Sequence, residues 1–160
     1  EVSNDAEDDK AKTILVLARS YAVYYTTQAE KFPGKPYDLD DTPEASQKYL
    51  GYGFEKRSPK IVNYVKATEH EVVTYDGKVI KTPYFTQTDG TATRSAESVW
   101  GWKDTPYLVS VPDTFCKDPG GFMGHGVGLS GCGATALAEQ GKSYKEIIEY
   151  YYTGAKVQAI

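Results

Sequence analysis

The sequence lacks a hydrophobic run long enough to cross a bilayer, because its apolar residues, 40% of the chain, are dispersed among polar ones. It also lacks a large excess of charge of either sign, since 18 basic and 22 acidic residues give a net charge of −4. Such a chain has no positive field to attract nucleic acid or anionic lipid. We therefore expect no nucleic-acid partner, and membrane association only through an anchor outside this segment.

Cysteine is scarce, and nucleotide-binding motifs are missing. The two cysteines, Cys116 and Cys132, either form a disulfide or remain small buried residues, and their number does not decide the redox compartment. The glycines match neither Gly-x-Gly-x-x-Gly nor Gly-x4-Gly-Lys-Ser/Thr, because no lysine follows the glycine-rich stretch before Lys142. A dinucleotide or ATP site is disfavoured, and we expect no cofactor.

What the sequence has instead is a glycine-rich stretch, residues 121–134, in which six glycines surround His125. Glycine permits positive φ and the close approach of a ligand or another strand. A helix-like run over 130–139 follows and would direct backbone N–H groups toward anything bound at its start. The stretch predicts a site containing Gly124, His125 and Gly126; the alternative is a tight turn with a hydrogen-bonded structural histidine.

Hydrophobic periodicity predicts helices at both ends of the chain. Apolar residues recur at helical spacing over 10–30, after an acidic segment that suits a helix N-terminus. Ser58 followed by proline indicates a short helix to about Ala67. A capping-box pattern at 143–146 starts a last helix that ends near 153–154.

Strand signals lie between these helices. Residues 71–75 and 78–85 flank Asp76-Gly77, a pair that favours a two-residue type I′ hairpin turn. A further extended stretch is expected at 107–111, and prolines and glycines predict an irregular excursion over 32–52 that flanks a cleft. The predicted fold class is α+β: a single mixed domain, residues 1–160, with a long N-terminal helix, a central sheet containing the hairpin, and C-terminal helices.

Seven segments resemble, in the same order, the motifs of the SpoIID/LytB family of peptidoglycan-acting domains. They are Arg-Ser-Tyr at 19–21, Gln-Lys-Tyr at 47–49, Thr-Tyr-Asp-Gly at 74–77, Ser-Ala-Glu-Ser-Val-Trp-Gly at 95–101, Pro-Tyr-Leu-Val-Ser-Val-Pro-Asp at 106–113, Gly-His-Gly-Val-Gly-Leu-Ser at 124–130 and Tyr-Lys-Glu-Ile-Ile-Glu-Tyr-Tyr at 144–151. The resemblance covers nearly all of the chain. Since the family extends further upstream and this chain begins at Glu1 without methionine, we expect a domain truncated at its N-terminus and excised from a longer protein.

The resemblance implies that Glu1 is catalytic. In the family an acidic residue opens a Glu-Met-Pro segment two helical turns before the Arg-Thr-Tyr helix, and counting back from Arg19 reaches Glu1, here followed by Val-Ser. The implied activity is that of a lytic transglycosylase, which cleaves between N-acetylmuramic acid (MurNAc) and N-acetylglucosamine (GlcNAc) in peptide-free glycan strands. The product carries a 1,6-anhydroMurNAc end. From the residues alone, Glu1 reads as a solvated terminal acid.

Other residues receive substrate-binding roles from the resemblance, each with a structural alternative. His125 would line the glycan cleft, flanked by Gly124 and Gly126. Arg19 is equally a structural ion-pair residue, Gln47 and Tyr49 are equally loop-packing residues, and Ser130 is equally a helix N-cap. Trp100 and Trp102 either stack on a sugar or fill the core.

Departures from the family pattern limit what carries over. The loop that holds a Cys and His-Cys zinc site in some members is here 38–46, without cysteine or histidine, so we predict no metal. The sequence also departs at 85–90 and at Gly131. The second hypothesis is therefore a non-catalytic glycan-binding or enhancer module that activates a cell-wall amidase. Both hypotheses predict peptidoglycan glycan strands as partner and an extracytoplasmic location in the bacterial cell envelope.

Overall fold

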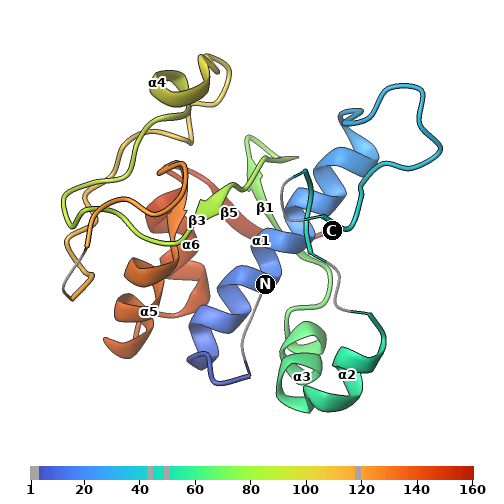
Figure 1. The fold of residues 1–160 in the computed structure, drawn as a ribbon, viewed down its shortest axis with the longest axis horizontal. Coiled ribbons are helices and arrows are strands. Elements are labelled where there is room, and N and C mark those ends of the chain that lie inside the picture. Colours follow the sequence, from blue (N-terminus) through green and yellow to red (C-terminus); the bar gives the residue numbers. More distant parts are fainter. Residues whose placement is uncertain (1–3, 43–44, 49–50, 118–119) are drawn as a thin grey trace.

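The longest element, α1 (Asp8–Thr27), runs through the middle of the molecule in the computed structural model, which describes residues 4–42, 45–48, 51–117 and 120–160 (Figure 1). The Glu7 side chain caps the helix by accepting from the Lys10 N–H at 2.9 Å. Its buried stripe, which includes Ile14 and Leu17, packs against β1, α5 and α6. The helix predicted over 10–30 is confirmed.

The remaining elements form a small mixed α+β domain, as predicted. The helices are α2 (Gly53–Arg57), α3 (Pro59–Ala67), α4 (Ala96–Trp100), α5 (Gly131–Glu139) and α6 (Tyr144–Tyr151), and the strands are β1 (Glu71–Tyr75), β2 (Lys78–Val79), β3 (Tyr84–Phe85), β4 (Leu129–Ser130) and β5 (Lys156–Ala159). No helix in the described ranges combines the length and apolar character that a membrane span requires.

The hairpin turn is confirmed, but the strand predicted after it is not continuous. Asp76 and Gly77 both have positive φ, 49° and 72°, as a type I′ turn requires. The prediction of one strand over 78–85 is wrong. β2 pairs antiparallel with β1, whereas β3 pairs in parallel with β4 in a second sheet. Pro83 lies between them and has no N–H to continue a ladder. β5, which the sequence analysis missed, completes the order β2-β1-β5.

The other local predictions have mixed outcomes. Residues 107–111 form no strand; they run beside 91–96, where the Leu108 carbonyl accepts from the Ala96 N–H at 2.9 Å. α3 begins at Pro59 as predicted, yet Ser58 makes no capping hydrogen bond, and its buried hydroxyl has no partner among the described residues. The Ser143 capping box of α6 is confirmed. The described residues of 32–52 contain no helix or strand.

The core lies between α1, the β1 sheet, α5 and α6, and it includes one buried acid. Asp113 is fully buried, and its two carboxyl oxygens accept from Tyr151 Oη at 2.7 Å and from Thr88 Oγ1 at 2.8 Å. The fully buried side chains of the core include Leu17, Val73, Leu129, Ile147, Ile148, Tyr151 and Tyr152. This core fixes α1, β3 and the start of α5 relative to one another.

Candidate functional site

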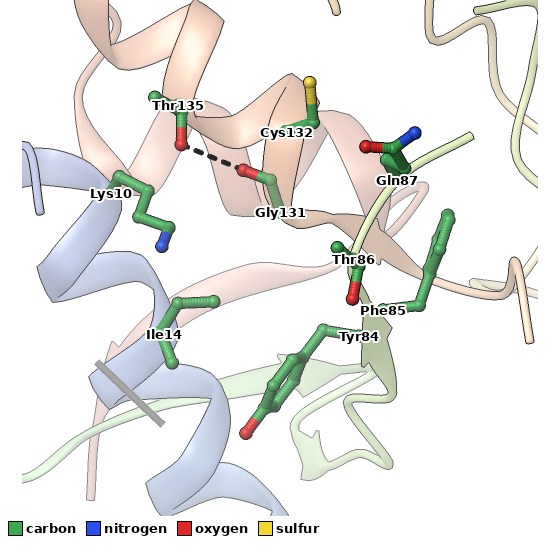
Figure 2. Close-up of a pocket in the computed structure, with 9 residues that line it drawn as sticks. All are labelled: Lys10, Ile14, Tyr84, Phe85, Thr86, Gln87, Gly131, Cys132 and Thr135. Carbon is green, nitrogen blue, oxygen red and sulfur yellow. Dashed lines mark hydrogen bonds between the residues drawn. The ribbon is translucent and has the colours of Figure 1, made fainter. Parts of the chain in front are cut away.

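The first turns of α1, the β3 segment and the start of α5 enclose a cleft of about 450 Å³. Figure 2 shows Lys10 extending from α1 into this space, with Thr86 and Gly131 on the opposite walls. The cleft is lined by Lys10, Ile14, Tyr84, Phe85, Thr86, Gln87, Gly131, Cys132 and Thr135. The lining combines polar and apolar groups in about equal parts and has one positive charge.

The pairing of β3 with β4 positions the start of α5, which forms one wall of the cleft. Phe85 lies opposite Ser130 in the parallel ladder, and the Cys132 N–H donates to the Thr86 carbonyl at 2.9 Å. Ser130 is fully buried and caps α5 by accepting from the Gly133 N–H at 3.2 Å. Of the two roles that the sequence left open for Ser130, the structure shows the capping role.

Lys10 is the residue of the cleft most suited to binding a polar ligand. Burial lowers the pKa of its ammonium group, and no carboxylate lies within 4.0 Å of it in the described ranges. The hydroxyl of Thr135 donates to the Gly131 carbonyl, and the amide of Gln87 donates to the Gly121 carbonyl. The Lys10 ammonium and the exposed Thr86 hydroxyl are therefore well suited to donate to a ligand.

His125 does not line this cleft, although it packs against Phe85, which does. Its ring centroid lies 5.7 Å from that of Phe85 and 4.9 Å from that of Trp100. Nδ1 accepts from the Val127 N–H at 3.0 Å. Burial lowers the pKa of the imidazole, partly offset by a hydrogen bond to the Tyr84 backbone. The ring is therefore neutral at neutral pH, and a glycan contact by His125 stays a prediction.

The glycines beside His125 have a packing reason. A Cβ added to Gly124, where φ is 104°, would lie 2.9 Å from Phe85 Cβ. At Gly126 it would lie 3.0 Å from Arg94 Cδ. Side chains of the protein itself therefore pack against the backbone at these two glycines. Contact of Gly124 and Gly126 with a glycan also stays a prediction.

The structure does not bring the other predicted binding residues to the cleft. Arg19 Nη1 donates to the Thr68 and Glu71 carbonyls at 2.7 and 2.9 Å, which ties the end of α3 to β1. Gln47 donates to the Ala18 carbonyl at 3.3 Å. Both therefore have structural contacts. Glu1 and Tyr49 lie outside the described residues.

The sequence analysis missed Lys10, Tyr84 and Thr135 as cleft residues. Lys10 and Ile14 lie one helical turn apart, and a lysine at the start of an amphipathic helix usually faces solvent. Only the tertiary contact between α1 and α5 reveals the different environment. In the described part of the chain, no three metal-ligating side chains converge.

A disulfide joins Cys116 to Cys132, with the two Cα atoms 5.5 Å apart. It links the segment after Asp113 to the first turn of α5, where Cys132 lines the cleft. This pairing decides between the two alternatives for the cysteines. The cleft wall is thus covalently attached to a segment 16 residues earlier in the chain.

Reduction of this disulfide is expected to lower the free energy of unfolding by about 3 kcal/mol, because the open chain regains the entropy of a loop of this size. Urea unfolding followed by tryptophan fluorescence, with and without reductant, measures the change. The Cys116→Ser/Cys132→Ser double variant should match the reduced protein and be insensitive to reductant. An unchanged midpoint on reduction would contradict the stabilising role.

Comparison with known proteins assigns the family. The sequence model of the stage II sporulation protein family, SpoIID, matches residues 1–75, which include α1 and β1. Stage II sporulation protein D of Bacillus subtilis is 44% identical over 45 residues, covering 28% of this chain and 13% of that protein. The chain carries a SpoIID-family domain. Another SpoIID relative, stage II sporulation protein D of Bacillus amyloliquefaciens, is 51% identical over 35 residues, 22% of this chain and 10% of that protein.

One further relative matches a longer part of this SpoIID-family domain. A protein from Brachyspira hyodysenteriae is 38% identical over 119 residues, covering 73% of this chain and 30% of that protein. The match to this chain therefore spans less than a third of each of these relatives. The SpoIID match covers Glu1, Lys10 and Ile14 but ends before the β3 wall of the cleft.

Proposed function

We propose that this SpoIID-family domain is a peptidoglycan lytic transglycosylase with Glu1 as its general acid and base. One observation carries the proposal: the segment that matches the family, residues 1–75, includes Glu1, and the α1 wall of the cleft follows nine residues later at Lys10. Glu1 and Asp8, the first residue of α1, are seven positions apart in the chain, which can span at most about 25 Å. The Glu1 carboxyl is therefore within chain reach of the cleft.

In this proposal Glu1 supplies the acid that the described cleft lining lacks. Its lining, as far as the structure describes it, offers an ammonium, hydroxyl and amide groups, and no carboxyl. Cleavage of a glycosidic bond needs a group that protonates the leaving oxygen, and a carboxylic acid is the usual donor. In the proposal, a ligand bound between Lys10 and Thr86 receives that proton from Glu1.

One carboxyl group suffices for the reaction. Glu1, protonated, donates to the oxygen between MurNAc and GlcNAc as the bond from that oxygen to C1 of MurNAc breaks. The resulting carboxylate then accepts the proton of the MurNAc C6 hydroxyl as O6 bonds to C1. No water is consumed, and Glu1 ends protonated. A hydrolytic glycosidase needs a second carboxyl to handle water, which this route does not.

The test is the mass of the products from peptide-free glycan strands. The proposal expects 1,6-anhydroMurNAc ends, which are one water lighter than hydrolysed ends. Reducing MurNAc ends would identify a hydrolase and overturn the transglycosylase assignment. The chain should carry its natural upstream residues, because proton transfer tolerates little misplacement of the carboxyl.

The absence of a carboxyl from the described cleft lining also favours a second candidate, a non-catalytic glycan-binding module that enhances a cell-wall amidase. Binding of glycan strands without any cleavage, weakened by His125→Ala and accompanied by stimulation of an added amidase, would support it. Either function places the protein outside the cytoplasm, at the peptidoglycan.

A further inference from the structure

A second pocket, of about 530 Å³, lies near the C-terminal end of α1. Tyr24 of α1 forms one side, Lys81 follows β2, and the segment after α4 supplies the rest. The pocket is lined by Tyr24, Lys81, Gly101, Trp102, Lys103, Asp104, Thr105 and Tyr107. The lining combines three aromatic rings with two lysines and one acid.

Lys81 is held in this pocket by aromatic faces. Its ammonium nitrogen lies 4.0 Å from the ring centroid of Trp102 and 5.5 Å from that of Tyr24. Both distances fall within the range of cation–π attraction. The rings therefore fix the position of the charge without neutralising it.

The charge of Lys81 has no acidic partner within 4.0 Å among the described residues, and burial lowers its pKa. Asp104 lines the same pocket but does not reach the ammonium within that distance. Six other lysines pair with acids: Lys12, Lys60, Lys117, Lys142, Lys145 and Lys156. A desolvated, positioned and unpaired ammonium favours an anionic ligand.

The two pockets lie along the same side of α1. Lys10 and Tyr24 are 14 residues apart, nearly four helical turns, so they share a face about 21 Å apart. Lys81 and Tyr84, one in each pocket, are three residues apart and thus separated by at most about 11 Å between Cα atoms. Thr82 between them donates to the Leu17 carbonyl at 2.8 Å and attaches this segment to α1. An extended polymer can therefore contact both pockets.

If the proposed function holds, the anion that Lys81 binds is a group of the glycan strand. When the stem peptide is removed from peptidoglycan, each MurNAc keeps a lactyl group that ends in a free carboxylate, and GlcNAc has no such group. We propose that the pocket around Lys81 and Trp102 binds the lactyl carboxylate of a MurNAc residue in the strand that occupies the Lys10 cleft. This inference rests on the proposed function and adds a subsite that selects peptide-free strands.

The test is a binding measurement in a Glu1→Gln background, which prevents cleavage. Peptide-free MurNAc-GlcNAc oligosaccharides are compared by calorimetry with GlcNAc oligosaccharides of equal length. Lys81→Gln should weaken MurNAc-GlcNAc binding about tenfold, because a charged hydrogen bond is lost, and leave binding of the GlcNAc polymer unchanged. Lys81→Arg should retain the preference. Lys78→Gln, an exposed lysine on β2 outside both pockets, is the matched control.

The outcomes separate this inference from the function on which it rests. If neither oligosaccharide binds, glycan recognition fails and both proposals fall. If both bind and Lys81→Gln weakens them equally, or weakens neither, the carboxylate subsite is wrong while the proposed function stands. Circular dichroism of Lys81→Gln, together with its retained binding of GlcNAc oligosaccharides, shows that the variant is folded.

Discussion

Gly133→Ala is expected to lower the free energy of unfolding by about 4 kcal/mol, although alanine is the better helix former. The added Cβ would lie 2.0 Å from Tyr151 Oη and 2.1 Å from Asp113 Oδ1. Neither atom can shift freely, because Tyr151 and Asp113 are fully buried and hydrogen-bonded to each other. The clash therefore outweighs the gain in helix propensity of about 1 kcal/mol.

Much of the loss is expected to come from the buried acid. Moving Tyr151 away from Asp113 removes one of the two hydroxyl donors that its carboxyl oxygens have, and water does not reach the site. A buried polar group left without its partner is destabilising by about 1–3 kcal/mol. Overpacking of the surrounding core adds a similar amount.

Urea unfolding, read from the midpoint and slope, measures the effect of Gly133→Ala. Gly53→Ala in α2 is the matched control, since a Cβ there would meet only the flexible end of Arg57, at 3.1 Å. That variant should be neutral or more stable by up to about 1 kcal/mol. Equal stability of the two variants would show that the contact between α5, Asp113 and Tyr151 is looser than described.

Local sequence signals were sufficient to predict the elements that begin or end at a characteristic turn or capping motif. The Asp76-Gly77 turn and the Ser143 capping box were both predicted and confirmed, because each depends on neighbouring residues alone. Ser58 shows the limit of such signals. It precedes α3 as expected, but its hydroxyl is turned into the protein and does not cap the helix.

Pairings between distant segments were beyond the sequence analysis. β3 and β4 are short strands of two residues each, too brief to show an alternating pattern, and β4 is positioned by its packing against α5 and α6. The partners of the glycines near His125 were also beyond the sequence analysis. The sequence indicated close approach near Gly124 but could not show that Phe85 is the approaching group.

The residues of the cleft were beyond the sequence analysis for the same reason. The sequence indicated the stretch around His125, which packs against the cleft residue Phe85, and Glu1, which lies outside the described residues. It gave no indication of Lys10 or Lys81, because a lysine looks the same in sequence whether or not an acid neutralises it. Only the tertiary structure reveals which lysines have no partner.

Glu1→Gln is expected to reduce the formation of 1,6-anhydroMurNAc ends by about 100- to 10,000-fold, the usual contribution of general acid–base catalysis. Glutamine has nearly the same shape as glutamate, so glycan binding should persist, but its amide neither donates a proton to the glycosidic oxygen nor accepts one from the C6 hydroxyl. Mass spectrometry of products over time measures the rate. Glu7→Gln is the matched control, since an amide oxygen can still accept from the Lys10 N–H and cap α1.

The pH dependence distinguishes a catalytic carboxyl from a structural one. A carboxyl that starts the reaction as an acid must hold its proton, so the wild-type rate should fall as pH rises and that carboxyl ionises. The residual rate of Glu1→Gln should lack this fall, whereas Glu7→Gln should keep it. If Glu1→Gln retains both the rate and the pH profile of the wild type, Glu1 is not the proton donor. Cleavage would then depend on a carboxyl outside the described cleft lining, whereas the absence of cleavage by the wild-type protein would favour the binding-module function.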